Sequence, residues 1–140
     1  MNVYAFLIGI IIVFGIIFHF KKTRLERTHW AYPLLLGTFP LYYFVFALYA
    51  WDINALMLEA LIGTLFLIIA YVAYKSGREI AALFVGIGCM LHGIYDVYHD
   101  SLFINEGMPN WWAEFCGSID LVLGGYLIYF SLKLKGEPES

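Results

Sequence analysis

The sequence predicts an all-α membrane protein in which a bundle of five helices crosses the bilayer. Three observations support this fold class: the composition, five apolar stretches of spanning length, and a one-sided distribution of lysine and arginine. Of the 140 residues, 62% are hydrophobic and 14% are charged, whereas a soluble domain has about 25% charged residues. A soluble core of this size is too small to hide so much apolar surface, so the surplus is expected to face lipid.

Five stretches reach the length of about 20 apolar residues that a membrane-spanning helix needs. The expected spans are Val3–Phe20, Tyr32–Trp51, Ile53–Tyr74, Ile80–Tyr98 and Trp111–Leu132. The first span lacks a preceding basic segment and is followed by a basic run, so we interpret it as a permanent span and not as a cleavable signal peptide. The connections are short, and residues 1–140 are therefore expected to form a single transmembrane domain.

The positions of the basic residues predict the orientation of the bundle. The first loop, the third loop and the C-terminal end contain all eight basic residues, namely Lys21, Lys22, Arg24, Arg27, Lys75, Arg78, Lys133 and Lys135. The second and fourth loops contain only the acids Asp52, Asp100 and Glu106. Lysine and arginine collect on the cytoplasmic side, so the N-terminus is expected outside and the C-terminus in the cytoplasm. We expect an integral protein of a bacterial cytoplasmic membrane.

Ionisable residues inside the predicted spans are the main indication of function. Such residues cost about 2.5–3.5 kcal/mol each near mid-bilayer, so they usually face the bundle and have a role. In the fourth span, His92, Asp96 and His99 stand at positions i, i+4 and i+7. At about 100° per residue they occupy an arc of about 60°, which predicts one polar face.

Two neighbouring spans place further polar residues at similar depth. Glu114 lies about one turn inside the fifth span, with Ser118 one turn below it and Asp120 deeper. Glu59 lies two turns into the third span, on the same face as Gly63. The third, fourth and fifth spans are therefore expected to enclose a polar site in the outer half of the membrane. The second span offers hydroxyl partners in Tyr42, Tyr43 and Tyr49.

A metal site is one function that this set of residues predicts. Imidazole and carboxylate groups suit a divalent transition metal such as zinc or iron, and helix bundles commonly hold such ligands. The predicted ligands are His92, Asp96, His99 and Glu114. Glu59, Asp120 and Ser118 would support them. A bound cation would offset the cost of burying several carboxylates.

Three other interpretations use the same residues. In the first, His92, Asp96 and Glu114 form a catalytic acid–base set acting on a lipophilic substrate from the bilayer. In the second, the residues form a pathway for protons or cations, which would need a homo-oligomer because five short helices leave one chain little room. In the third, they only stabilise a subunit of a membrane complex.

Cys89 and Cys116 are interpreted as small buried hydrophobic residues. Membrane lipid is the expected partner, and the net charge of −3 excludes a basic face for nucleic acid.

Two resemblances concern the fourth and fifth spans. The pairing of HGIYDVYHD, from His92, with PNWWAEFCGSID, from Pro109, resembles an uncharacterised family of small bacterial membrane proteins. A local likeness to the five-helix sterol isomerases of the emopamil-binding-protein group rests on a His-x-x-x-acid pair and a Trp-x-Glu-aromatic motif. Matching residues here are His92, Asp96, Trp112, Glu114 and Phe115, with aspartate where those enzymes have glutamate. The likeness implies proton transfer on a sterol-like ligand by His92, Asp96 and Glu114.

Overall fold

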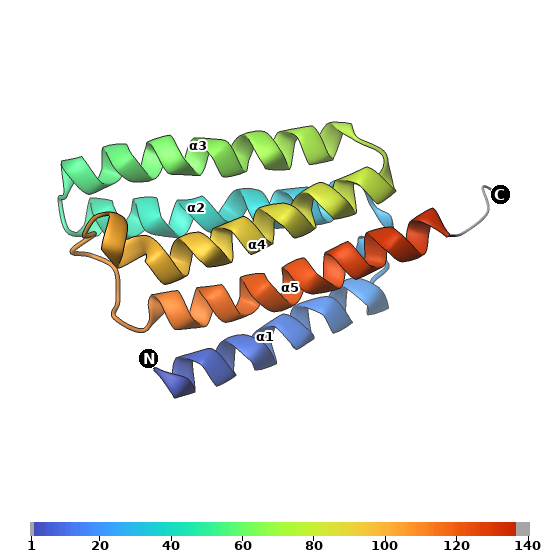
Figure 1. The fold of residues 1–140 in the computed structure, drawn as a ribbon, viewed down its shortest axis with the longest axis horizontal. Coiled ribbons are helices and arrows are strands. Elements are labelled where there is room, and N and C mark those ends of the chain that lie inside the picture. The colour runs from blue at the N-terminus through green and yellow to red at the C-terminus, as the bar shows by residue number, and fades with distance from the viewer. Residues whose placement is uncertain (1, 137–140) are drawn as a thin grey trace.

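The chain folds into five long helices joined by short connections (Figure 1). The structure is a computed structural model that describes residues 2–136, so Met1 and residues 137–140 lie outside the described part. In order, the elements are α1 (Val3–Lys22), the short 3-10 helix η1 (Leu25–Arg27), α2 (Ala31–Tyr49), α3 (Ile53–Lys75), α4 (Arg78–Leu102) and α5 (Trp112–Lys135). Each of the five α-helices is long and apolar enough to span a membrane. The prediction of an all-helical fold with five candidate spans is thus confirmed.

Helix ends differ from the predicted spans because a helix can continue past its last apolar residue. α4 continues to Leu102 and α5 continues to Lys135, beyond the apolar stretches that defined their spans. The opposite occurs in α2, which ends at Tyr49, because Trp51 adopts a left-handed conformation with φ of 56° and turns the chain. The Asp52 carboxylate then accepts a hydrogen bond from the Ala55 N–H at 2.9 Å and caps α3.

The helices lie side by side along one long axis (Figure 1). α1 packs against α5, α5 packs against α4, and α4 in turn contacts both α2 and α3. α4 and α5 are the most buried helices, and α1 is the least buried. The main hydrophobic core therefore lies around α4 and α5, where Val85, Cys89, Leu123 and Leu127 are fully buried.

Successive helices run in opposite directions, so the loops divide between the two ends of the bundle. One end, which we call the basic end, carries η1, the α3–α4 connection and the last turn of α5, and with them all eight lysines and arginines. The other end, which we call the acidic end, carries the start of α1, the α2–α3 turn at Asp52, and the α4–α5 loop with Glu106.

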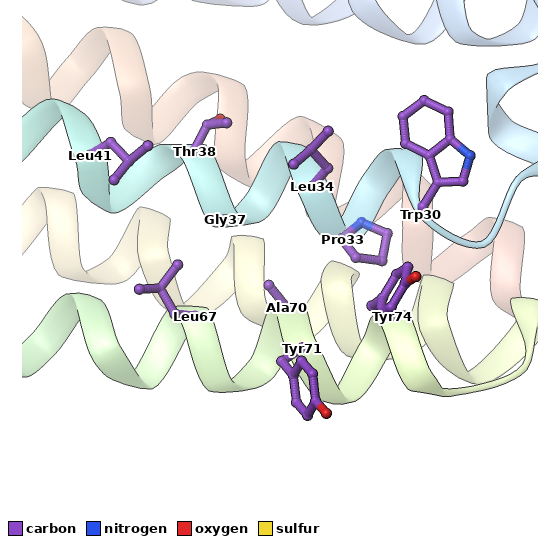
Figure 2. A pocket seen from close by; sticks show the side chains of 10 residues that line it. All are labelled: Trp30, Pro33, Leu34, Gly37, Thr38, Leu41, Leu67, Ala70, Tyr71 and Tyr74. Atoms are coloured by element: carbon purple, nitrogen blue, oxygen red, sulfur yellow. The ribbon is translucent and has the colours of Figure 1, made fainter.

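The outer surface of the bundle is apolar, as lipid contact requires. Exposed side chains on three different helices include Ile11, Leu61 and Val97, which are 71%, 69% and 64% exposed. An apolar groove of about 390 Å³ lies between α2 and α3 (Figure 2). Its lining residues are Trp30, Pro33, Leu34, Gly37, Thr38, Leu41, Leu67, Ala70, Tyr71 and Tyr74.

α4 and α5 approach each other closely because glycines lie at their contact. A Cβ atom on Gly124 of α5 would lie 2.9 Å from the Gly86 carbonyl oxygen and 2.8 Å from Met90 Cγ of α4. A Cβ atom on Gly93 would lie 3.1 Å from the Asp120 Cβ atom, farther along the same contact. Close packing through small residues is the usual basis of helix association in membranes, and here it brings the polar faces of the two helices together.

Adjacent glycines in α5 provide a direct test of this contact. Gly124→Ala is expected to destabilise the fold by about 1–3 kcal/mol, because the methyl group would overlap backbone atoms of α4. Gly125→Ala is the matched control, since a Cβ atom there meets nothing within 4 Å, and it should leave stability unchanged or raise it slightly. Unfolding in mixed micelles with increasing SDS measures both. Equal stability of the two variants would contradict the close α4–α5 contact.

Candidate metal centre and polar network

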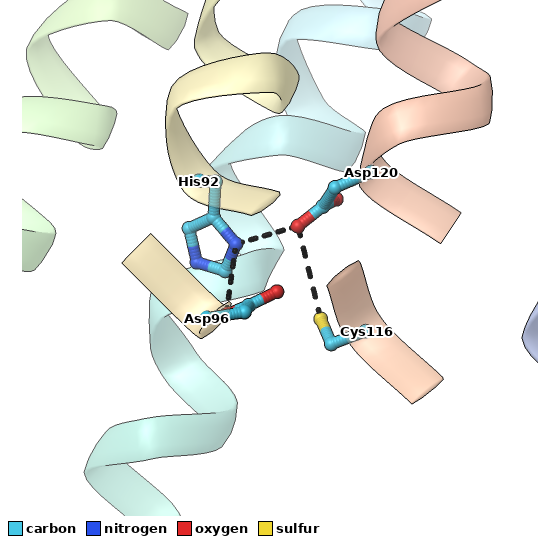
Figure 3. Close-up of side chains that lie close together, drawn as sticks. All are labelled: His92, Asp96, Cys116 and Asp120. Carbon is cyan, nitrogen blue, oxygen red and sulfur yellow. Dashed lines mark hydrogen bonds and ion pairs between the residues drawn. The ribbon is translucent and has the colours of Figure 1, made fainter. Parts of the chain in front are cut away.

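Two pairs of metal-ligating side chains face each other across the α4–α5 contact (Figure 3). α4 contributes His92 and Asp96, and α5 contributes Cys116 and Asp120. Each pair is spaced i, i+4 and therefore lies on one face of its helix. One donor atom from each of the four residues lies within 4.8 Å of all the others. We call this group the His92 cluster.

All four residues of the His92 cluster are buried in the bundle. His92 and Asp96 are each 1% exposed, Cys116 is 5% exposed and Asp120 is fully buried. His92 Nδ1 lies 2.7 Å from Asp120 Oδ2 and 3.5 Å from Asp96 Oδ1. The Cys116 Sγ atom lies 3.9 Å from Asp120 Oδ2. A single imidazole thus lies between two carboxylates, with a thiol beside them.

Carboxylate oxygens in the His92 cluster remain without partners. Asp96 Oδ1 accepts a hydrogen bond from the Tyr43 hydroxyl, whereas Asp96 Oδ2 and Asp120 Oδ1 have no hydrogen-bond partner. Buried polar atoms are nearly always paired, and an orphaned one calls for a specific explanation such as a bound ion. The donors of this cluster fit a divalent cation, because two carboxylates balance its charge and the orphaned oxygens offer further lone pairs.

The chemistry and spacing of the donors are those of a group that could hold a metal ion. Zinc is bound by thiolate, imidazole and carboxylate in a tetrahedral arrangement whose donors stand roughly 3.3–3.8 Å apart. The four donor atoms lie within 4.8 Å of one another, so one metal ion could contact all four residues. The phenyl rings of Phe39 and Phe66 lie against the imidazole of His92, with ring centroids 5.5 and 4.7 Å away, and they restrict its orientation.

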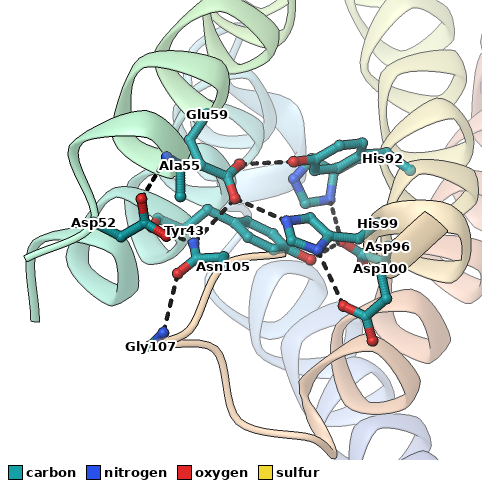
Figure 4. A network of polar contacts seen from close by, with 11 residues as sticks. Tyr43, Asp52, Ala55, Glu59, His92, Asp96, His99, Asp100, Asn105 and Gly107 are labelled. Atoms are coloured by element: carbon teal, nitrogen blue, oxygen red, sulfur yellow. Dashed lines mark hydrogen bonds and ion pairs between the residues drawn. The ribbon is translucent and has the colours of Figure 1, made fainter. Parts of the chain in front are cut away.

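A second polar group lies closer to the acidic end, around the carboxylate of Glu59 (Figure 4). Glu59 Oε1 lies 2.8 Å from His99 Nε2 and accepts a hydrogen bond from Asn105 Nδ2 at 3.1 Å. The Tyr95 hydroxyl donates to Glu59 Oε2 at 2.7 Å. We call these four residues the Glu59 group. Glu59, only 2% exposed, therefore has both carboxylate oxygens engaged, in contrast to the acids of the His92 cluster.

Tyr43 of α2 lies between the two groups. Its hydroxyl donates to Asp96, while its ring stacks on the imidazole of His99 with centroids 4.9 Å apart and an interplanar angle of 24°. The Tyr43 carbonyl accepts a further hydrogen bond from Asn105 in the α4–α5 loop. On the outward side, His99 Nδ1 lies 3.3 Å from Asp100, whose carboxylate is 78% exposed. The polar residues thus extend from the bundle interior to the surface at the acidic end.

The predicted site residues fall into three places. His92, Asp96 and the supporting residue Asp120 come together in the His92 cluster. His99 and the supporting residue Glu59 meet in the Glu59 group instead, because His99 lies one turn nearer the acidic end than Asp96.

Glu114 and Ser118 lie elsewhere, although both were predicted to belong to the site. Glu114 is half-buried beside the start of α1, where its Oε1 accepts a hydrogen bond from the Asn2 N–H at 3.0 Å. Ser118 is buried against Gly9 of α1 and donates to the Phe115 carbonyl. α1 packs on the face of α5 that carries these two residues, so they face away from His92 and are not members of the His92 cluster.

Sequence reasoning missed three residues that the structure brings into these groups. Cys116 precedes Asp120 by four residues, the same spacing as His92 and Asp96, and this repeated spacing could have identified it. Tyr95 stands at i+3 from His92 on the predicted polar face, which was also a usable signal. Asn105 lies in the α4–α5 loop, and no periodicity exists in a loop that would predict its contact with Glu59.

The fold and the His92 cluster define a helical membrane protein with a buried group of potential metal ligands. The chain matches no protein-family model, no curated protein and no solved structure. The likeness to sterol isomerases therefore stays a prediction. Among its matched residues, His92 and Asp96 lie in the cluster, whereas Glu114 lies beside α1.

A pair of tyrosines on α4 tests the Glu59 group. Tyr95→Phe is expected to lower the free energy of unfolding by about 1 kcal/mol, because it removes the donor to Glu59 Oε2 and leaves that buried oxygen without a partner. Tyr98→Phe is the matched control, since Tyr98 is 60% exposed, and it should have no effect. The measurement is again unfolding in mixed micelles. A Tyr95→Phe variant as stable as the wild type would argue against the contact.

Proposed function

We propose that this protein is a metal-binding integral membrane protein that holds one divalent transition-metal ion in the His92 cluster. The proposed ligands are His92, Asp96, Cys116 and Asp120. Zinc is favoured over iron, because the set includes a thiol and zinc readily combines sulfur, nitrogen and oxygen ligands. Glu114 and His99 leave the ligand set predicted from the sequence, since neither belongs to this cluster.

One observation carries this proposal: two buried carboxylates, each with an unpartnered oxygen, lie beside an imidazole and a thiol within 4.8 Å. Burying charged groups in an apolar bundle is costly unless an opposite charge or strong hydrogen bonds compensate. A divalent cation would supply that charge and would engage Asp96 Oδ2 and Asp120 Oδ1, which accept no hydrogen bond. Tyr43 would hold Asp96 in position through its hydroxyl, as residues behind metal ligands commonly do.

Catalysis on a lipophilic substrate is less well supported than metal binding. His92, Asp96 and Asp120 are at most 1% exposed, so a substrate could reach them only if helices separated. The apolar groove between α2 and α3 shares no lining residue with the cluster.

Proton transfer is favoured by the contact of His99 with both Glu59 and the exposed Asp100. Among residues 2–136, however, no hydrogen bond joins the Glu59 group to the His92 cluster, and the Tyr43 ring lies between them. A bound ion requires only the local cluster. We therefore place metal binding ahead of a proton pathway.

Metal content of the purified protein tests the proposal. Protein isolated in detergent through a tag that binds no metal should contain about one zinc or iron ion per chain. His92→Ala or Cys116→Ala should weaken binding at least about tenfold, because each removes a ligand. Elemental analysis by mass spectrometry, after equilibration with buffered zinc, gives both the content and the relative affinity.

Cys89→Ala is the matched control for Cys116→Ala. Both cysteines are buried and free, but Cys89 is outside the cluster, so this variant should keep its metal. In cobalt-loaded protein, a sulfur-to-cobalt absorption band in the near ultraviolet should persist in Cys89→Ala and vanish in Cys116→Ala. Folded wild-type protein that takes up no metal, or equal metal in all variants, would refute the proposed centre.

We further propose that the basic end faces the cytoplasm and the acidic end faces outward in a bacterial cytoplasmic membrane. Support comes from the restriction of all eight lysines and arginines to the basic end, which the positive-inside rule assigns to the cytoplasm. The His92 cluster and the Glu59 group would then lie in the half of the bundle nearer the outer surface, and Asp100 would meet the external solution.

Reporter fusions in a bacterial host test this orientation. A green fluorescent protein fused after Ser140 should fluoresce, because that end is expected in the cytoplasm. Alkaline phosphatase fused after Asn105, in the α4–α5 loop, should be active, whereas the same enzyme fused after Gly77 should be inactive. The reverse pattern of phosphatase activity would show that the orientation is inverted.

A further inference from the structure

A pocket with three cationic side chains lies at the basic end, and none of its lining residues belongs to the His92 cluster. It has a volume of about 310 Å³ and is lined by Glu26, Arg27, Arg78, Phe130, Lys133 and Leu134. The three cations come from three separate elements, since Arg27 ends η1, Arg78 begins α4 and Lys133 lies in the last turn of α5. The fold, and not local sequence, therefore brings these charges together.

The cations that line this pocket outnumber the acids three to one. Within residues 2–136, Arg27, Arg78 and Lys133 make no ion pair with a carboxylate. The one acid in the lining, Glu26, instead accepts a hydrogen bond from the Tyr126 hydroxyl at 2.8 Å. Three positive charges around one cavity repel one another, and an anion in the cavity would remove that repulsion.

Two further features make the pocket suitable for an anion. Arg78, which lines the pocket, is the first residue of α4, so the positive end of the helix dipole lies near the pocket. A separate and much smaller cavity shares Glu26, Arg78 and Phe130 with the pocket and is also lined by Tyr32. The Tyr32 hydroxyl is buried, with the residue only 3% exposed, and has no hydrogen-bond partner.

We propose that this pocket binds a phosphate group. Two guanidinium groups supply paired donors that match phosphate oxygens, and the ammonium group of Lys133 adds a third charge. The phosphate could belong to the headgroup of an anionic membrane lipid or to a soluble phosphate. The lipid is the better match, because the pocket lies where α4 begins and α5 ends, at the depth of headgroups, and Phe130 and Leu134 form an apolar side.

Lipid binding to paired triple variants tests the proposal. The pocket variant is Arg27→Gln/Arg78→Gln/Lys133→Gln. The control variant is Lys22→Gln/Lys75→Gln/Lys135→Gln, which removes the same charge from the same end at residues that do not line the pocket. In native mass spectrometry with phosphatidylglycerol, the wild type and the control should retain one lipid that the pocket variant binds at least about tenfold more weakly. Phosphatidylcholine should show no such difference.

Titration with inorganic phosphate distinguishes the two sources. A soluble phosphate is the ligand if two results are found together. Inorganic phosphate raises the thermal stability of the wild type and the control but not of the pocket variant, and phosphatidylglycerol binds all three proteins equally. If the pocket variant and the control variant have the same affinity for phosphatidylglycerol and are stabilised equally by phosphate, the proposed phosphate site is wrong. Metal content should be unchanged in both, because no substituted residue touches the His92 cluster. Should the triple variant not purify, Arg27→Gln alone, outside the α-helices, is expected to show the same direction of effect.

Discussion

The close contact between α4 and α5 is the constraint on which the rest of the structure depends. Gly86 and Gly93 on α4 meet Gly124 and Gly117 on α5, and a Cβ atom at Gly86, Gly93 or Gly124 would crowd the facing helix. Because the axes are close, two i, i+4 pairs of polar residues reach each other across the contact. Without it, each helix would present carboxylates to lipid, at a cost that few membrane helices tolerate.

The two groups of buried acids in this bundle differ in whether all of their carboxylate oxygens have hydrogen-bond partners. The Glu59 carboxylate accepts hydrogen bonds from Tyr95 and Asn105 and pairs with His99, so both of its oxygens have partners. The His92 cluster contains more acceptors than donors and leaves Asp96 Oδ2 and Asp120 Oδ1 without partners. This difference is what distinguishes a hydrogen-bonded structural network from a group of residues suited to a cation.

The two proposed binding sites have opposite charge and lie in opposite halves of the molecule. Acids gather inside the bundle toward the acidic end, whereas the cations of the phosphate pocket line the surface of the basic end. A buried cation would neutralise the first site, and a membrane headgroup would neutralise the second. Both assignments follow from one principle: groups of like charge are brought together by the fold only at a cost, and a ligand of opposite charge removes that cost.

The sequence by itself determined the five helices, their order and the segregation of basic residues, because apolar length and charge position are properties of the chain. It also identified Glu59, His92, Asp96 and Asp120 as residues that face the interior of the bundle, because ionisable side chains within a span avoid lipid. Only the tertiary structure decided their partners. Packing between helices paired His99 with Glu59 and Asp96 with Tyr43, and it placed Glu114 beside α1. It also brought Cys116 to Asp96 and Asn105 to Glu59. Helical periodicity determines which face of a helix a residue lies on. The alignment of one helix against another depends on side-chain packing between the two, and the sequence of a single span does not determine that packing.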